Sequence, residues 1–155
     1  MAFTWCLKGM RLLVTTMLCG LLSVSVATAP LARVRYVMLP ARAIDGVVGH
    51  QGTWAPTKGE TADLEASVGQ ISLLPIEGWP TKLHIEHPEN YYRQYVPIIR
   101  DGHRLVYVNA FCDDPPPRNW RTKLVVFIDG ATCCWQAFYD PATKKYSRLR
   151  INARA

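Results

Sequence analysis

The sequence lacks the motifs that mark most families of enzymes and nucleotide-binding proteins. It contains no phosphate-binding glycine loop, no Ser-His-Asp context and no paired-carboxylate motif, so we expect no catalytic residues, no cofactor and no metal. It also has no internal repeat and no low-complexity tract. Charged residues make up only 19% of the chain, too few for a disordered protein, whereas hydrophobic residues make up 49%, enough to bury the core of one domain.

No hydrophobic run is long enough to cross a bilayer. The longest, residues 12–26, has about fifteen residues, fewer than the roughly 20 that a spanning helix needs. It follows a segment with two basic residues and no acid, and it ends in small residues. This pattern is typical of a secretory signal peptide cleaved after Ala27, and an uncleaved anchor is the alternative. We therefore predict an exported protein, periplasmic or secreted, that touches the membrane only through residues 1–27 before cleavage.

The charge of the chain is only mildly positive. Of the eighteen basic and twelve acidic residues, two basic and no acidic ones lie in residues 1–27, so cleavage lowers the formal net charge from +6 to +4. This density is far from that of a nucleic-acid-binding protein, and it favours anionic partners only weakly. We expect no nucleic acid as partner, and the candidate partner is another envelope or extracellular protein.

The first part of the exported chain contains one helix signal. Residues 28–53 show neither helical nor strand period and are interrupted by two prolines and three glycines, which predicts a flexible leader before a single domain over 54–155. Thr57 and Glu60 have the spacing of a capping box. The apolar residues Leu64, Val68 and Ile71 then recur at helical spacing. This pattern predicts an amphipathic helix over roughly 58–74.

The rest of the chain is strand-like. Asp101-Gly102 separates two aromatic and β-branched runs and is typical of a two-residue hairpin turn. We predict five strands, over residues 91–100, 103–112, 122–128, 133–140 and 146–152. One helix followed by consecutive strands predicts an α+β fold, with one N-terminal helix packed on a four- to five-stranded antiparallel meander sheet, in a cystatin-like or NTF2-like layout.

The second half of the chain carries aromatic, Asp-Gly and cysteine positions in a distinctive order. They are Tyr92, Gln94-Tyr95, Asp101-Gly102, Tyr107, Asn109, Phe111-Cys112, Trp120, Asp129-Gly130, Cys133, Trp135, Tyr139-Asp140 and Asn152. This pattern resembles that of a group of small uncharacterised secreted proteins of Gram-negative bacteria. Two positions depart from it, because Ala131 replaces a glycine and Cys134 replaces an aromatic residue. The resemblance implies the fold and the export, and it implies no activity.

Three cysteines remain once residues 1–27 are removed: Cys112, Cys133 and Cys134. Four interpretations stay open, namely a catalytic thiol, a zinc site, a bond between the two adjacent cysteines, and a Cys112–Cys133 bridge. In a simple meander, an intervening strand would hold Cys112 and Cys133 about 20 Å apart, unless the loop over 113–121 travels the length of that strand. The resemblance favours the Cys112–Cys133 pair with Cys134 free, since both paired cysteines belong to its pattern.

Two groups of residues are candidates for binding. Aromatic and amide side chains of the predicted strands are candidates for lining a ligand pocket between helix and sheet: Tyr95, Tyr107, Asn109, Trp135 and Tyr139. The last strand places an aromatic and two basic residues on one face, as a candidate surface for an anionic partner or as an ordinary solvated face: Tyr146, Arg148 and Arg150. Together these features predict a non-enzymatic binding or inhibitor-like module. The alternative is a small enzyme or ligand carrier that uses the pocket.

Overall fold

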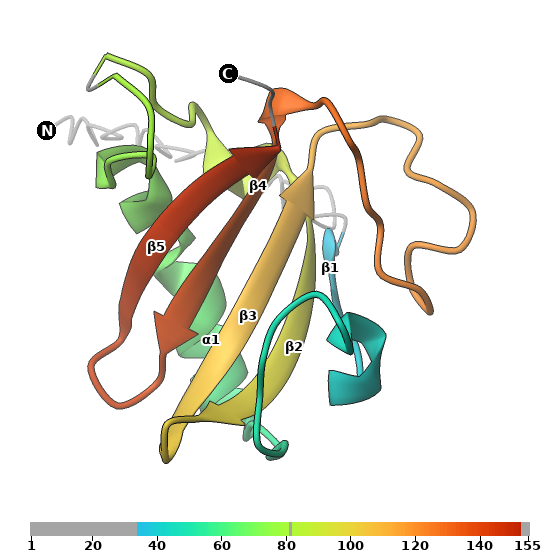
Figure 1. Ribbon diagram of the computed structural model, residues 1–155, viewed down its shortest axis with the longest axis vertical. Coiled ribbons are helices and arrows are strands. Elements are labelled where there is room, and N and C mark those ends of the chain that lie inside the picture. The colour runs from blue at the N-terminus through green and yellow to red at the C-terminus, as the bar shows by residue number, and fades with distance from the viewer. Residues whose placement is uncertain (1–33, 81, 153–155) are drawn as a thin grey trace, which may run out of the picture. The chain divides into compact units, whose positions relative to one another are not determined.

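The computed structural model describes residues 34–80 and 82–152, and the predicted signal peptide lies outside them. In this part of the chain five strands form one sheet, in the order of their labels, and a single α-helix packs on the sheet (Figure 1). The strands are β1 (Tyr36–Met38), β2 (Tyr92–Arg100), β3 (His103–Phe111), β4 (Ala131–Asp140) and β5 (Lys145–Asn152). The helix is α1 (Lys58–Ala66), and three short 3-10 helices accompany it: η1 (Ala41–Ile44), η2 (Val68–Leu73) and η3 (Pro88–Asn90).

The predicted antiparallel meander is wrong, because the sheet is mixed. β1 runs parallel to β2, whereas the other neighbouring strands are antiparallel. β1 lies within residues 28–53, for which the sequence predicts a flexible leader, and Ile44 just after it is fully buried. A strand of three residues is too short to show an alternating hydrophobic pattern in the sequence, so it can be identified only from its pairing with β2. A parallel pair also needs a long crossover, which the chain through α1 supplies.

The predicted helix is present but shorter than its hydrophobic pattern indicates. The capping box of Thr57 and Glu60 forms, with both reciprocal hydrogen bonds. α1 ends at Ala66, and the chain continues as the 3-10 helix η2. At the junction the Ser67 hydroxyl donates to the Asp63 carbonyl, 2.7 Å away, a local bond that competes with regular helix. The apolar face of the predicted helix is still buried. Two of its residues, Leu64 and Ile71, pack with Leu149 of β5 in one core cluster.

The predicted strand over 122–128 is absent. These residues belong to a long connection between β3 and β4, residues 112–130, which we call the long loop. Its backbone groups are satisfied by amide side chains of the sheet instead of by a strand ladder: the Val125 N–H donates to Gln94, and the Val125 carbonyl accepts from Asn109. As a result β3 pairs directly with β4, with Phe111 opposite Cys134.

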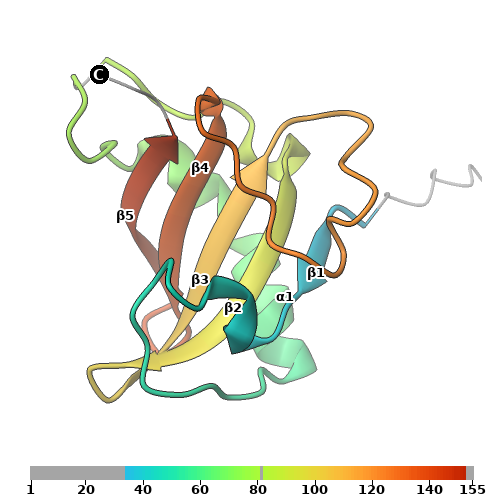
Figure 2. The ribbon, with the colours of Figure 1, turned by 45° about the vertical axis from the view of Figure 1, so that its right-hand side comes forward.

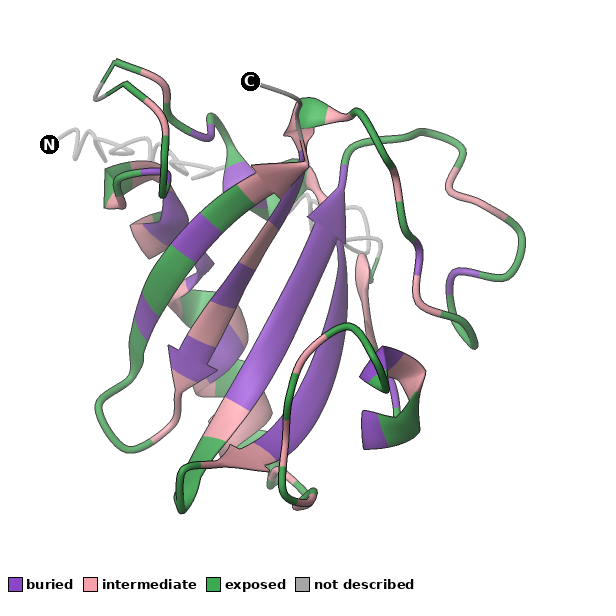
Figure 3. Ribbon diagram, in the orientation of Figure 1, coloured by how far each residue is buried: buried purple, intermediate pink, exposed green. Residues whose placement is uncertain are grey.

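Different parts of the chain cover the two faces of the sheet (Figure 2). α1 and η2 cover one face, which we call the helix face. On the opposite face, residues 38–49, which we call the arm, pack over β2 and β3, and the long loop lies beside them. β2 and β3 are therefore buried along most of their length, whereas β5 alternates between buried and exposed residues (Figure 3).

Candidate functional site

A row of amide side chains crosses the face opposite α1. Gln94, Asn109 and Gln136 lie opposite one another on β2, β3 and β4. The Asn109 amide donates to Gln94 at 2.9 Å, and the Gln136 amide donates to Asn109 at 3.2 Å. Gln94 is completely buried and also donates to the carbonyls of Trp120 and Lys123, so the row holds the long loop on the sheet. Neutral amides suit this task, because they satisfy backbone donors and acceptors alike.

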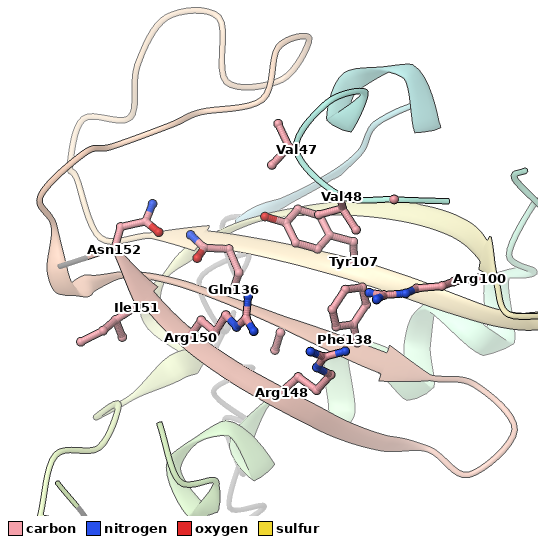
Figure 4. A pocket seen from close by; sticks show the side chains of 12 residues that line it. Val47, Val48, Arg100, Tyr107, Gln136, Phe138, Arg148, Arg150, Ile151 and Asn152 are labelled. Carbon is pink, nitrogen blue, oxygen red and sulfur yellow. The ribbon is translucent and has the colours of Figure 1, made fainter. Parts of the chain in front are cut away.

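The arm and the long loop leave part of this face open over β4 and β5. There a groove of about 420 Å³ lies between the arm and the two strands (Figure 4). Its charged lining residues, among those that the structure describes, are all arginines: Arg100, Arg148 and Arg150. Tyr107, Gln136 and Asn152 add a hydroxyl and two amides, and we call this cavity the arginine groove.

The groove depends on an irregularity in β5. Gln136 pairs with Arg150 and Phe138 pairs with Ser147, so β5 carries one extra residue relative to β4 between these pairs. Arg148 has a φ of 56°, the left-handed conformation that such a bulge accommodates. Because of the bulge, the side chains before and after it no longer alternate between the two faces in one continuous pattern. A prediction that assumes strict alternation along the strand misses this change.

This phase shift corrects the predicted anionic-partner surface. Tyr146 does not share a face with Arg148 and Arg150, because it is buried on the helix face and its hydroxyl donates to the Leu64 carbonyl at 2.9 Å. The two arginines are exposed and line the groove on the other face. The sequence therefore predicts two of the three arginines of the groove, misses Arg100 and misassigns the tyrosine.

One carboxylate neutralises part of the positive charge. Glu77 lies 2.7 Å from the Arg150 guanidinium and 3.5 Å from that of Arg148. The hydrogen bond from Arg150 is the main reason that the pKa of Glu77 is below its ordinary value. Arg100 lies over the Phe138 ring at 5.5 Å and 3.6 Å from Asp101. Three guanidinium groups thus share two carboxylates, and both carboxylates lie outside the groove lining.

The phenol of Tyr107 completes the set of donors. Burial raises the pKa of Tyr107 to about 12, so the hydroxyl keeps its proton at neutral pH. A neutral phenol both donates and accepts hydrogen bonds. Together with the guanidinium and amide N–H groups, it makes the groove rich in donors for an anionic ligand.

The five residues predicted to line a pocket between helix and sheet do not meet in one cavity. Tyr95, Trp135 and Tyr139 point to the helix face, where they are part of a filled core cluster. Tyr107 and Asn109 lie on the opposite face, since the side chains of a strand alternate between its faces. The sequence predicts that these residues line one pocket, but the phase of the strands places them on two faces of the sheet.

A buried ion pair joins α1 to the sheet near Tyr95. The Arg93 guanidinium donates to both carboxylate oxygens of Glu65, at 2.9 and 3.2 Å, and to the Tyr95 hydroxyl at 3.0 Å. Its remaining donors reach the carbonyls of Pro88, Glu89 and Tyr91. The Tyr95 hydroxyl also donates to Glu65. Because each of its three guanidinium nitrogens donates to a group inside the protein, Arg93 is a structural anchor, and the sequence shows no pattern that would find it.

The cysteines form a bridge at the base of the long loop. The sulfur atoms of Cys112 and Cys133 are 2.00 Å apart and their Cα atoms 5.1 Å apart. The two residues are close because no strand intervenes between β3 and β4, contrary to the simple meander. Cys134 is free and buried on the other side of its strand, and burial raises the pKa of its thiol to about 11. A group of Cys112, Asp113 and Cys133 has the spacing of metal ligands, but the bridge occupies both of its sulfurs.

No family model, curated protein or solved structure matches the chain. Among the described residues, no helix combines the length and the apolar character needed to cross a membrane. The resemblance to small secreted proteins of Gram-negative bacteria therefore stays a prediction. Only the chemistry of the arginine groove and its surroundings bears on function.

Proposed function

We propose that this protein is an exported, non-enzymatic binding module that holds an anionic group of its partner in the arginine groove. One observation carries the proposal: Arg100, Arg148 and Arg150 converge on an open groove whose lining contains no carboxylate. Guanidinium groups bind carboxylates, phosphates and sulfates through paired N–H donors, and a shared set of three strengthens this preference.

The composition of the groove supports binding more than catalysis. Its described lining holds no cysteine, serine, histidine or acid that would act as a nucleophile or general base. The aliphatic side chains of Val47 and Val48 form one wall, so a bound anion is partly shielded from water. The space between α1 and the sheet, where a ligand carrier would need its pocket, is filled by aromatic side chains.

The cysteine bridge supports the exported location. Disulfides persist in oxidising compartments, and the Cys112–Cys133 bond fits such an address. Combined with the signal-peptide pattern over residues 1–27, it favours the periplasm or the cell exterior. The partner is then another envelope or extracellular molecule with exposed anionic groups.

The proposal is tested by titrating the exported protein with citrate and with inorganic phosphate while recording its amide NMR spectrum. We expect the largest shifts at Arg148, Arg150 and Gln136, and we expect Arg148→Gln with Arg150→Gln to weaken binding about tenfold or more. Lys145→Gln is the matched control, because Lys145 is an exposed cation of the same strand outside the groove. Equal loss in the control, or shifts spread evenly over the surface, would refute specific binding in the groove.

A further inference from the structure

A second groove lies beside the arginine groove, between the arm and the long loop. It has a volume of about 630 Å³ and is lined by residues 38–40, 42–43 and 47 of the arm and by residues 121–124 and 126 of the loop. Three cations face it from both walls: Arg42, Arg121 and Lys123. Its lining contains no acid, and none of these three cations forms an ion pair with a residue that the structure describes. The positive charge of this groove is therefore available to a partner.

The same groove concentrates exposed aliphatic surface. Val47 and Val126 are 56% and 66% exposed, and Met38 is 36% exposed. They account for half of the large hydrophobic side chains that the described residues leave exposed. Apolar side chains gathered at one place on a surface, and rimmed by polar ones, are typical of an interaction site. We call this cavity the basic–aliphatic groove.

The chemistry of the basic–aliphatic groove selects among anionic partners. Among the residues that the structure describes, its lining includes no aromatic ring, so these residues offer no platform on which a sugar or a nucleobase would stack. It is a recess between two segments of chain, whereas an anionic membrane needs a convex or flat surface that presents apolar side chains outward. A polypeptide that carries both carboxylates and aliphatic side chains matches the cations and the aliphatic wall together.

The two grooves share one lining residue. Val47 of the arm lines both of them. A chain that leaves the basic–aliphatic groove over Val47 would therefore reach the arginine groove. An extended segment rises about 3.3 Å per residue, so about eight residues would span roughly 25 Å.

From this shared lining we propose that the partner is an extended acidic polypeptide segment with aliphatic side chains, bound across both grooves. This inference rests on the proposed function for the arginine groove and names the partner class for it. Carboxylates of the segment pair with the cations of the two grooves, and its aliphatic side chains pack on Val47 and Val126. The disulfide at the base of the long loop keeps one wall of the basic–aliphatic groove in place.

The test uses a fluorescein-labelled peptide of alternating Asp and Val, eight residues long, and measures its anisotropy with the exported protein. A matched peptide of alternating Asp and Ser has the same charge without the aliphatic groups. We expect the Asp-Val peptide to bind about tenfold more tightly than the Asp-Ser peptide, because it buries several methyl groups. We expect Arg42→Gln with Lys123→Gln to weaken its binding about fivefold to tenfold, and Val126→Ser about threefold.

Controls separate the two proposals. The substituted residues are exposed, and an unchanged melting curve verifies that each variant folds. Lys145→Gln should leave the affinity unchanged. One result would separate them: the double variant Arg148→Gln, Arg150→Gln binds the peptide more weakly, whereas the double variant Arg42→Gln, Lys123→Gln binds it as the unmodified protein does. The proposed function would then stand and this inference would fail.

Three other outcomes also overturn the inference. Equal affinity for the two peptides would mean that the groove recognises charge alone. Tighter binding to heparin than to the Asp-Val peptide would identify a polysaccharide as the partner. Stronger association with vesicles that contain phosphatidylglycerol than with the peptide would identify an anionic membrane surface.

Discussion

Replacing Arg93 by Met should remove the main link between α1 and the sheet. The substitution keeps an apolar stem about as long as that of arginine, and it deletes the guanidinium beyond that stem. Glu65 then loses both hydrogen bonds from Arg93, and the carbonyls of Pro88, Glu89 and Tyr91 lose the donor that joins them. The perturbation is therefore mainly electrostatic and polar, and the space that the buried guanidinium leaves adds a smaller packing term.

The size of the effect follows from the burial of the pair. The Arg93 side chain is 5% exposed and that of Glu65 is 25% exposed. Removing one partner of a buried ion pair costs about 3–5 kcal/mol, and water that reaches Glu65 places the value near the lower end, about 3 kcal/mol. Because a domain of this size is stable by roughly 5–15 kcal/mol, this loss is large but leaves the protein folded at room temperature.

Urea unfolding followed by circular dichroism measures the loss, with the m-value as a check that the transition stays two-state. The control is Arg104→Met, which breaks the pair between Arg104 and Glu60 on the surface, where the arginine is 51% exposed, and should cost less than about 1 kcal/mol. Substituting Glu65 by Leu in the Arg93→Met protein should recover part of the loss, since no buried charge is left unpaired. A loss below about 1 kcal/mol, or equal to that of the control, would refute the role of Arg93 as an anchor.

Four further predictions concern the bridge, its surroundings and the arginine groove. Replacing Cys112 and Cys133 by Ser should destabilise the protein by about 3 kcal/mol, because their bond closes a loop with a sequence separation of 21; calorimetry with an unshifted melting temperature would contradict this. Gly130→Ala should lower the melting temperature by several degrees, because the new Cβ would lie 2.4 Å from the Cys134 sulfur and 2.7 Å from the Cys134 Cβ, and pairing it with Cys134→Ala should restore only part of the loss, because alanine keeps that Cβ. Burial raises the pKa of the Cys134 thiol to about 11, so this group should leave stability unaffected below about pH 9 and lower it as the pH rises towards 11, because the unfolded thiol ionises first; Cys134→Ala should flatten that part of a stability–pH curve. Glu77→Gln should strengthen citrate binding several-fold by releasing the guanidinium groups that Glu77 holds, and an unchanged or weaker affinity in calorimetric titration would exclude Glu77 as a competitor for them.

Elements with short-range causes are the ones that sequence reasoning predicts well. The hairpin of β2 and β3 turns at Asp101 and Gly102, whose φ values of 52° and 77° are those that an Asp-Gly turn accommodates. The capping box begins α1 at the expected residue, since its two hydrogen bonds join residues only three apart. These interactions are decided within a few residues, so the local sequence is sufficient to find them.

The candidate site is only partly predictable, because strand phase is a long-range property. Arg148 and Arg150 follow from the basic stripe of the last strand, but the bulge that separates them from Tyr146 follows from pairing with β4. Arg100 lies on β2, far in sequence from the two arginines of β5, and no sequence motif links it to them. One wall of the groove comes from the arm. The arm contains too little regular secondary structure for a hydrophobic period in the sequence to predict its position.

The sequence by itself therefore determined the hairpin, the buried face of α1 and two of the three arginines, and its export pattern stays a prediction. The tertiary structure decided the position of residues 122–128. The buried side-chain amides of Gln94 and Asn109 hydrogen-bond to the backbone of this segment, and so replace the bonds that a neighbouring strand would otherwise supply. With that segment outside the sheet, β3 and β4 become neighbours, and Cys112 reaches Cys133. The same displaced segment forms a wall of the basic–aliphatic groove, so both the bridge and the surface proposed for the partner depend on hydrogen bonds between residues about thirty positions apart.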